Sequence, residues 1–243
     1  MAVVDELLRH DPEVHTELAQ GVAQTYGLHA SALRWLEANV RPDWRTLETG
    51  CGMSTVVFAA TGADHITISP FESESDQVRD WCADRGISTG RVTFVDDISE
   101  RVLPGMDLGD LDLVLVDGAH AFPQVFIDWY YASQSLRVGG LLLIDDLPLW
   151  TGYVLHGFLR QEPGWEFVQS FAGRIALFRK TAPMDPMRGF RAQPYVASRS
   201  AVEGWRCYVT LARHRQFRHA WVRGTAAVTR RLRSAELMRR LHG

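Results

Sequence analysis

The chain has 243 residues, 46% hydrophobic and 10% aromatic, which supports a full-sized hydrophobic core and excludes global disorder. Its three cysteines lack paired spacing, which argues against a disulfide framework and a structural zinc site. We expect a soluble cytoplasmic protein, because there is no signal-peptide pattern and no apolar run long enough to span a membrane.

The net charge of −3 is unevenly distributed along the chain. Residues 1–183 carry 26 acidic and 13 basic side chains, whereas residues 184–243 carry 13 arginines and three acidic residues. This division predicts an acidic globular part followed by a basic C-terminal extension.

The first 40 residues are predicted to form an N-terminal helical cap. Apolar side chains recur at helical spacing through residues 3–8 and again through residues 14–26. Ser31 is a candidate N-cap for a third helix, which Pro42 ends.

From residue 41 to residue 183, predicted strands and helices alternate. Continuous apolar strands joined by helices are typical of a parallel sheet covered on both faces. A short turn at residues 171–173 then joins two strands as an antiparallel hairpin. We therefore predict an α/β, Rossmann-like domain over residues 41–183. The expected strands are 45–48, 65–69, 91–95, 111–116, 140–144, 165–170 and 174–179, and the expected helices are 54–60, 72–85, 121–136 and 148–160.

A glycine turn, Glu48-Thr49-Gly50-Cys51-Gly52, follows the first strand of this domain. Glycines let the backbone turn tightly and approach a ligand at the edge where strand order reverses. A dinucleotide site would need a third glycine, where this chain has Thr55, and an acidic residue about twenty positions further on. Glu48 ahead of the first glycine instead favours S-adenosylmethionine.

This segment resembles motif I of class I methyltransferases. The sequences of residues 116–120 (VDGAH) and 139–146 (GGLLLIDD) resemble later motifs of the catechol-type and macrocin-type O-methyltransferase branch. The likeness covers residues 29–180 and implies a mostly parallel sheet, an antiparallel C-terminal hairpin and an S-adenosylmethionine cofactor. The cofactor contacts that it implies are Glu48, Thr49, Gly50, Cys51, Gly52, Ser54, Thr55, Ser69, Pro70, Asp97, Ile98, Asp117 and Gly118.

The chain departs from this family at the end of the second strand. The family has an acidic residue there that holds the ribose hydroxyls, whereas this chain has Ser69-Pro70. Ser69 itself, or Glu72 at the start of the next helix, is the candidate replacement. Asp97 and Ile98 occupy the position that contacts the adenine in the family.

Three carboxylates are expected to meet at the ends of two neighbouring strands, since Asp117 ends one strand and Asp145 and Asp146 end the next. Clustered oxygens suit Mg²⁺, and the resemblance implies that these residues are its ligands, with the metal activating the substrate hydroxyl. Two other interpretations stay open: Asp117 contacts the cofactor alone, and Asp146 caps the helix that Pro148 opens.

His120 lies three residues after Asp117 and is the candidate general base, because an imidazole titrates close to neutral pH. The alternative is a histidine that only hydrogen-bonds to backbone or substrate. Cys51 is a weaker candidate nucleophile, for which a packing role is favoured. Trp150, Tyr153 and His156 line either an acceptor pocket or the core.

Two helices are predicted in the basic extension, near residues 200–216 and 219–241. Their apolar stripe favours docking on the chain's own domain or homo-oligomerisation. Binding of nucleic acid by the arginines is a less favoured alternative. The whole sequence thus predicts O-methylation of a small-molecule hydroxyl, with Mg²⁺ assisting. An RNA or protein methyltransferase targeted by the extension, or an inactive cofactor-binding homologue, is the alternative.

Overall fold

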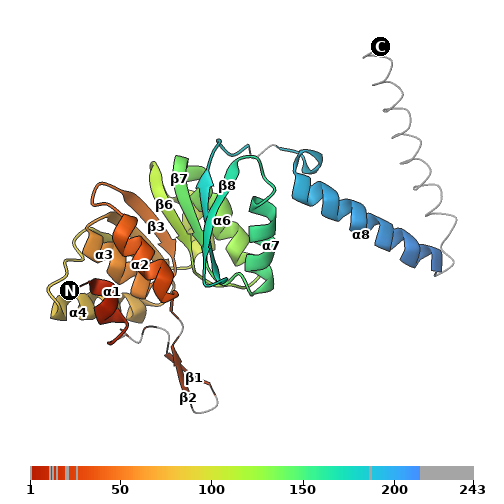
Figure 1. The fold of residues 1–243 in the computed structure, drawn as a ribbon. Helices are drawn as coiled ribbons and strands as arrows, with labels where there is room; N and C mark the ends of the chain where they lie inside the picture. The colour runs from red at the N-terminus through yellow and green to blue at the C-terminus, as the bar shows by residue number, and fades with distance from the viewer. Residues whose placement is uncertain are drawn as a thin grey trace. The chain divides into compact units, whose positions relative to one another are not determined.

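Figure 1 shows the computed structural model of the chain, which describes residues 2–10, 12, 14, 16–19, 22–25, 27–185 and 188–213. The chain divides into two compact units, residues 1–187 and residues 188–243. Each unit is described by itself. The first contains the sheet and the second contains the C-terminal extension.

In the described part of the first unit, seven strands form one mixed sheet with the order β5-β4-β3-β6-β7-β9-β8. The first five strands in this order are parallel, and β9 runs antiparallel to both β7 and β8. The predicted parallel sheet closed by a hairpin is therefore confirmed. The strand bounds are Arg45–Thr49 (β3), Asp64–Ser69 (β4), Val92–Asp96 (β5), Leu111–Val116 (β6), Leu136–Ile144 (β7), Trp165–Phe171 (β8) and Ile175–Lys180 (β9).

Helices cover both faces of this sheet, as Figure 1 shows. Alternating side chains of β6 divide between the two hydrophobic layers: Leu113 packs in one, and Val114 packs in the other. The first layer is covered by α1 (Val3–Leu7), α2 (Ala30–Asn39), α3 (Met53–Thr61) and α4 (Glu72–Asp84). The second is covered by α6 (Gln124–Ser135) and α7 (Trp150–Leu159), with the short α5 (Ser99–Val102) and η1 (Leu103–Gly105) beside α6.

The N-terminal segment differs from the prediction. Instead of a helix over residues 14–26, Thr16–Ala19 (β1) and Val22–Thr25 (β2) pair as antiparallel strands. Apolar spacing of four residues also satisfies the two-residue period of a strand, so the helical pattern did not discriminate between them. The predicted cap of α2 is also wrong, because His29 is the N-cap and its Nδ1 accepts a hydrogen bond from the Ser31 amide.

In the second unit, η2 (Phe190–Ala192) precedes one long helix, α8 (Pro194–Arg213). This helix starts six residues before the predicted one, since Pro194 suits the first turn of a helix. The predicted helix over residues 219–241 lies outside the described residues. Within the described part of the chain, no helix combines the length and the apolar character needed to cross a membrane.

A buried carboxyl group lies beneath the edge of the sheet that carries the predicted site. Asp128 on α6 is 1% exposed, and a Cβ on Gly118 would lie 3.2 Å from its Oδ2. Burial raises the pKa of Asp128 to about 6, although the hydroxyls of Ser99 and Thr49 act in the opposite direction. An unfolded aspartate titrates near pH 4, roughly two pKa units lower. Asp128 therefore lowers stability as the pH rises from about 4 to about 6.

We predict that Asp128→Asn raises the free energy of unfolding at pH 7 by up to roughly 3 kcal/mol, since one pKa unit corresponds to about 1.4 kcal/mol. At pH 4 the variant and the parent should differ little. Denaturant unfolding across pH 4–8 measures both, with Asp84→Asn on the exposed side of α4 as the control. A variant that is destabilised at pH 7, or equally changed at both pH values, would contradict the prediction.

Candidate functional site

The register of three parallel strands sets the position of the site. Thr49 of β3 pairs with Val116 of β6, which pairs with Ile144 of β7. The residues that follow these three, Gly50, Asp117 and Asp145, therefore leave the sheet side by side. Backbone bonds hold the Asp117 amide to the Thr49 carbonyl (3.1 Å) and the Asp145 amide to the Val116 carbonyl (3.0 Å). The expected proximity of the two strand ends is thus confirmed.

The loop after β3 packs tightly against the end of β6. Gly50 has a φ of +100°, and a Cβ on it would lie 2.4 Å from the Asp117 carbonyl oxygen. Its amide donates to the Ile68 carbonyl at 2.8 Å, and its carbonyl accepts from the Thr67 hydroxyl at 2.7 Å. Only glycine fits both this backbone conformation and this close approach.

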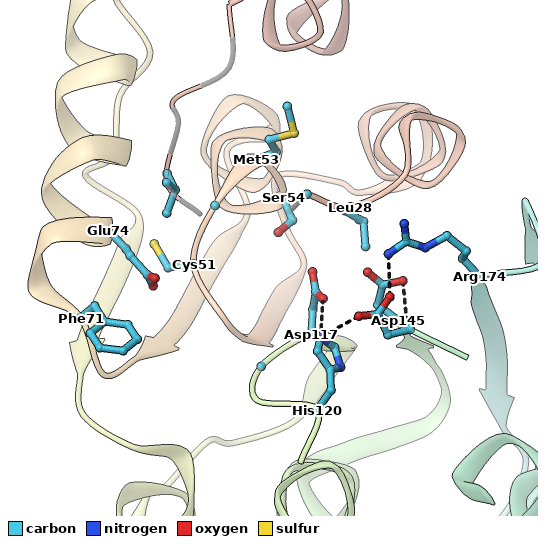
Figure 2. A pocket seen from close by; sticks show the side chains of 15 residues that line it. Leu28, Cys51, Met53, Ser54, Phe71, Glu74, Asp117, His120, Asp145 and Arg174 are labelled. Atoms are coloured by element: carbon cyan, nitrogen blue, oxygen red, sulfur yellow. Dashed lines mark hydrogen bonds and ion pairs between the residues drawn. The ribbon is translucent and has the colours of Figure 1, made fainter. Parts of the chain in front are cut away.

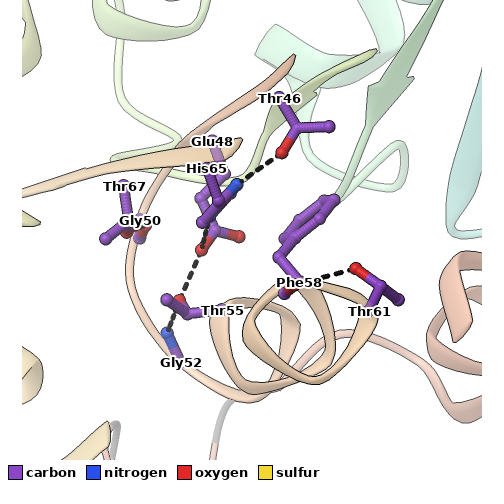
Figure 3. A network of polar contacts seen from close by, with 9 residues as sticks. All are labelled: Thr46, Glu48, Gly50, Gly52, Thr55, Phe58, Thr61, His65 and Thr67. Carbon is purple, nitrogen blue, oxygen red and sulfur yellow. Dashed lines mark hydrogen bonds and ion pairs between the residues drawn. The ribbon is translucent and has the colours of Figure 1, made fainter. Parts of the chain in front are cut away.

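A buried polar network supports the loop from below (Figure 3). The Glu48 carboxylate, 1% exposed, accepts from the Thr55 hydroxyl and lies 3.1 Å from His65 Nε2. The same hydroxyl accepts from the Gly52 amide at 2.9 Å, and His65 Nδ1 lies 2.8 Å from Thr46 Oγ1. Glu48, a predicted cofactor contact, therefore lies beneath the loop and anchors the start of α3.

A pocket of about 330 Å³ opens above this edge of the sheet (Figure 2). Its walls come from the segment before α2, the loop after β3, the start of α4, the ends of β6 and β7, and the turn before β9. It is lined by Val14, Gly27, Leu28, Cys51, Gly52, Met53, Ser54, Phe71, Glu74, Asp117, Gly118, His120, Asp145, Asp146 and Arg174.

Charged side chains gather at one end of this pocket. His120 Nε2 lies 3.2 Å from Asp146 Oδ2 and 3.8 Å from Asp117 Oδ1. The Arg174 guanidinium donates to Asp146 Oδ1 at 2.6 Å, and this hydrogen bond is the main cause that raises the pKa of Arg174. The Thr151 hydroxyl donates to the His120 carbonyl at 2.6 Å, which ties the histidine segment to α7.

Asp117 and Asp145 favour sharing one proton between their two carboxyl groups. Burial, followed by the charge of Asp145, raises the pKa of Asp117 well above its usual range. Burial is also the largest cause that raises the pKa of Asp145, while the Asp146 amide donates to it at 2.6 Å and acts in the opposite direction. The hydrogen bond between the two carboxyl groups favours protonated Asp117 as donor and ionised Asp145 as acceptor.

Asp146 is held in a strained conformation with a φ of +52°. Its carbonyl accepts from the Leu149 amide at 2.9 Å, and a Cβ on Gly152 would lie 2.6 Å from it. Leu149 is the N-cap of α7, so Asp146 does not cap this helix as one interpretation of the sequence proposed. The strained turn aims the Asp146 side chain at His120 and Arg174.

This arrangement does not fit the predicted Mg²⁺ site. Asp146 already faces the Arg174 guanidinium and His120, and a cation beside Asp146 would be repelled by that guanidinium. The described residues contain no group of three or more His, Cys, Asp or Glu side chains placed to hold a metal ion. The metal ligands predicted from sequence therefore meet, as expected, but they form a carboxyl–guanidinium–imidazole cluster.

The structure brings eight of the predicted site residues to the pocket. Asp97 is not among the residues that line it: its carboxylate accepts from the Ile98 amide at 2.7 Å and from Arg101 at 2.8 Å. Glu48, Thr49, Gly50, Thr55, Ser69, Pro70 and Ile98 also do not line the pocket, whereas Cys51, Gly52, Ser54, Asp117, Gly118, His120, Asp145 and Asp146 do.

Two charged residues of the pocket were missed from the sequence. Arg174 lies in the hairpin turn before β9. The sequence of a turn does not predict which strand end the turn will lie beside. Glu74 lies one turn inside a polar helix, where its burial depends on the packing of that helix. A buried acidic side chain in an otherwise polar helix leaves no periodic signal.

The weaker candidates have structural roles. Burial raises the pKa of the Cys51 thiol to about 12, so it stays protonated and packs as a small residue. His156 packs edge-on against the Phe178 ring, with 5.8 Å between ring centroids. Trp150 and Tyr153 are exposed on α7 and do not line the pocket.

Comparison with known proteins finds a similar domain and a similar fold. Residues 47–147 match the family model of a methyltransferase domain. No curated protein matches the sequence. Solved structures that share the fold include the O-methyltransferase TomG from Streptomyces achromogenes, with 19% identity, 65% of this chain and 83% of that chain covered, and a TM-score of 0.53.

Two further solved structures show the same likeness. A proposed O-methyltransferase from Klebsiella pneumoniae is 18% identical, with 75% of this chain and 91% of that chain covered and a TM-score of 0.58. The methyltransferase PaMTH1 from Podospora anserina is 17% identical, with 64% and 80% covered and a TM-score of 0.53.

The family match covers residues 47–147, and the sheet has the fold of the O-methyltransferase structures named above. The matched segment runs from the end of β3 to the residues just after β7 and so includes the glycine turn and the three carboxylates.

We predict that Gly50→Ala weakens S-adenosylmethionine binding at least tenfold and lowers stability by about 2–4 kcal/mol, because it combines a strained φ with a backbone collision. Gly86→Ala is the matched control, since Gly86 also has a positive φ but nothing lies within 4 Å of the added Cβ. Its cost should be only about 1 kcal/mol. Calorimetry and thermal unfolding measure both, and equal effects in the two variants would contradict the account.

Proposed function

We propose that this protein transfers a methyl group from S-adenosylmethionine to a hydroxyl of a small molecule, with His120 as the general base. The observation that supports this most is the place of His120, which lines the same pocket as the loop after β3. A pocket near 300 Å³ suits a small ligand. TomG, which shares the fold, is an O-methyltransferase.

The glycine turn fits the proposed cofactor. A Cβ on Gly50 would collide with the Asp117 carbonyl, so this glycine holds the turn against the end of β6, and Gly52 of the same turn lines the pocket. We infer that Gly52, Ser54 and Asp117 bind the cofactor, and that Asp117 does so as a neutral hydrogen-bond acceptor, because its one proton is donated to Asp145. S-adenosylmethionine supplies the electrophilic methyl group when it is bound.

His120 then acts on the acceptor. Because Nε2 faces the acceptor oxygen of Asp146, the neutral imidazole carries its proton on Nε2 and accepts through Nδ1. A hydroxyl bound next to Nδ1 donates its proton to the imidazole, which makes the oxygen a better nucleophile. The imidazolium that forms lies beside the Asp146 carboxylate, which stabilises the new charge. Arg174 holds this carboxylate in place and balances its charge before the proton moves. Positioning of the acceptor oxygen in the pocket supplies a further part of the rate.

We predict that His120→Ala lowers the rate of methyl transfer about 10²–10⁴-fold while the affinity for S-adenosylmethionine changes less than threefold, since general-base catalysis contributes on that scale. S-adenosylhomocysteine release with a panel of small phenols and alcohols measures turnover. His10→Ala is the control, because His10 is exposed and does not line the pocket. Unchanged turnover in His120→Ala would remove His120 from the mechanism.

Metal assistance is the alternative route for the same reaction. Because Arg174 already neutralises Asp146, we predict that excess EDTA lowers the rate by less than twofold. The matched variant Arg174→Ala should lose activity, and added Mg²⁺ should not restore it. Inactivation of the parent protein by EDTA with recovery on Mg²⁺ addition would contradict this proposal and support the metal site predicted from sequence.

The C-terminal extension is proposed to mediate homo-oligomerisation rather than nucleic-acid binding. In α8, Val202 and Trp205 are exposed large apolar residues, whereas Arg206 pairs with Glu203 at 2.6 Å. An exposed tryptophan on a helix favours contact with another apolar surface. The oligomeric state and the acceptor both stay predictions.

A further inference from the structure

The helix α8 of the second unit is open to solvent over much of its length. Every residue from 198 to 207 is exposed, which is about three turns of the helix. Val202 and Trp205 lie within these turns and are 48% and 68% exposed. Gly204 lies between them, and a glycine in the interior of a helix weakens it. Because helices gain most of their stability from packing of an apolar face, this composition favours a partner that covers that face.

The apolar residues of α8 follow a seven-residue repeat, whose positions are labelled a to g with Tyr195 at a. Tyr195, Val202 and Val209 then occupy successive a positions, and Trp205 occupies a d position. This spacing places the side chains in one stripe along the helix, as in a coiled coil, and valine at a favours two strands. Ser198, at the preceding d position, is polar, but its hydroxyl donates to the Tyr195 carbonyl at 2.9 Å.

The two edges of this stripe differ in charge. Arg199 and Arg206 lie along one edge, at successive e positions, whereas Ala201 and Tyr208 lie along the other edge, at successive g positions. A helix that lies on an anionic lipid surface is favoured by cationic side chains along both edges of its apolar face, because their stems reach past it to the headgroups. A single basic edge instead favours a partner helix.

A second copy of α8 matches both edges in one orientation. In a parallel pair, the e edge of each helix lies against the g edge of its partner, so the arginine stems pack beside the uncharged edge that holds Ala201 and Tyr208. In an antiparallel pair, the two e edges face each other and bring Arg199 and Arg206 of both copies together, which like charges disfavour. The parallel pair is two-fold symmetric, as most homodimers are.

We propose that α8 pairs with α8 of a second copy as a parallel two-stranded coiled coil. This assignment rests on the proposed homo-oligomerisation through the C-terminal extension, and it names the surface and the orientation. The stripe of each copy, with Val202 and Trp205 at its centre, covers that of the other.

The orientation is tested by cysteine cross-linking of the full-length protein with Cys207→Ser, since the other two cysteines, Cys51 and Cys82, are buried. Residues of the same number face each other at the a positions of a parallel pair. Val202→Cys should therefore form a disulfide-linked dimer with oxidised glutathione. Ser200→Cys, at an exposed f position on the opposite side of the helix, is the matched control and should not cross-link.

The interface is tested by sedimentation equilibrium of the full-length protein. Trp205→Glu should raise the Kd of the dimer at least about 30-fold, since a buried tryptophan is a typical hot spot of an interface. Ser200→Glu adds the same charge on the opposite side of the helix and should leave the Kd within about threefold of the parent value, less than 1 kcal/mol. Calorimetry with S-adenosylhomocysteine should give the same affinity in both variants.

Three results would overturn the proposal. Equal cross-linking of Val202→Cys and Ser200→Cys, or a dimer that Trp205→Glu leaves intact, would overturn the coiled coil while homo-oligomerisation stands. A parent protein that is monomeric at high micromolar concentration would overturn homo-oligomerisation and the coiled coil with it. Binding of such a monomer to anionic phospholipid vesicles or to RNA, lost in Trp205→Glu, would assign the stripe to that ligand instead.

Discussion

The close packing of Gly50 against the Asp117 carbonyl is the constraint on which the site depends. It exists because β3 and β6 are adjacent where the strand order reverses, with Thr49 level with Val116. A side chain at Gly50 would push the loop after β3 away from the end of β6. The same contact holds the loop after β3 against the end of β6, where Gly52 and Asp117 line one pocket.

The buried polar groups near this contact have different partners and different consequences. Glu48 is satisfied by Thr55 and His65 beneath the loop, and it stabilises the start of α3. Asp117 and Asp145 share a hydrogen bond, which allows two carboxyl groups to lie together without two charges. Asp146 pairs with Arg174, and among these carboxyl groups it lies closest to His120. Three carboxyl groups at one edge thus have separate roles.

The sheet was predictable because its evidence is local: apolar strands such as residues 111–116 and a turn at residues 171–173 determine the strands almost alone. The site was predictable only where it follows a strand end, as for Asp117 and Asp145. Glu74 and Arg174 reach the pocket because a helix and a hairpin turn pack beside it. The periodicity of apolar residues in the sequence does not predict that packing. The β1–β2 hairpin was missed because its four-residue spacing fits helix and strand equally.

The most direct test of the account is a crystal structure of the protein with S-adenosylhomocysteine. The account predicts that the ligand follows the loop after β3, with its sulfur directed to the end of the pocket that holds Asp117 and His120. It also predicts the Asp146–Arg174 pair intact in that complex. A ligand bound elsewhere, or a metal ion that separates Asp146 from Arg174, would contradict it.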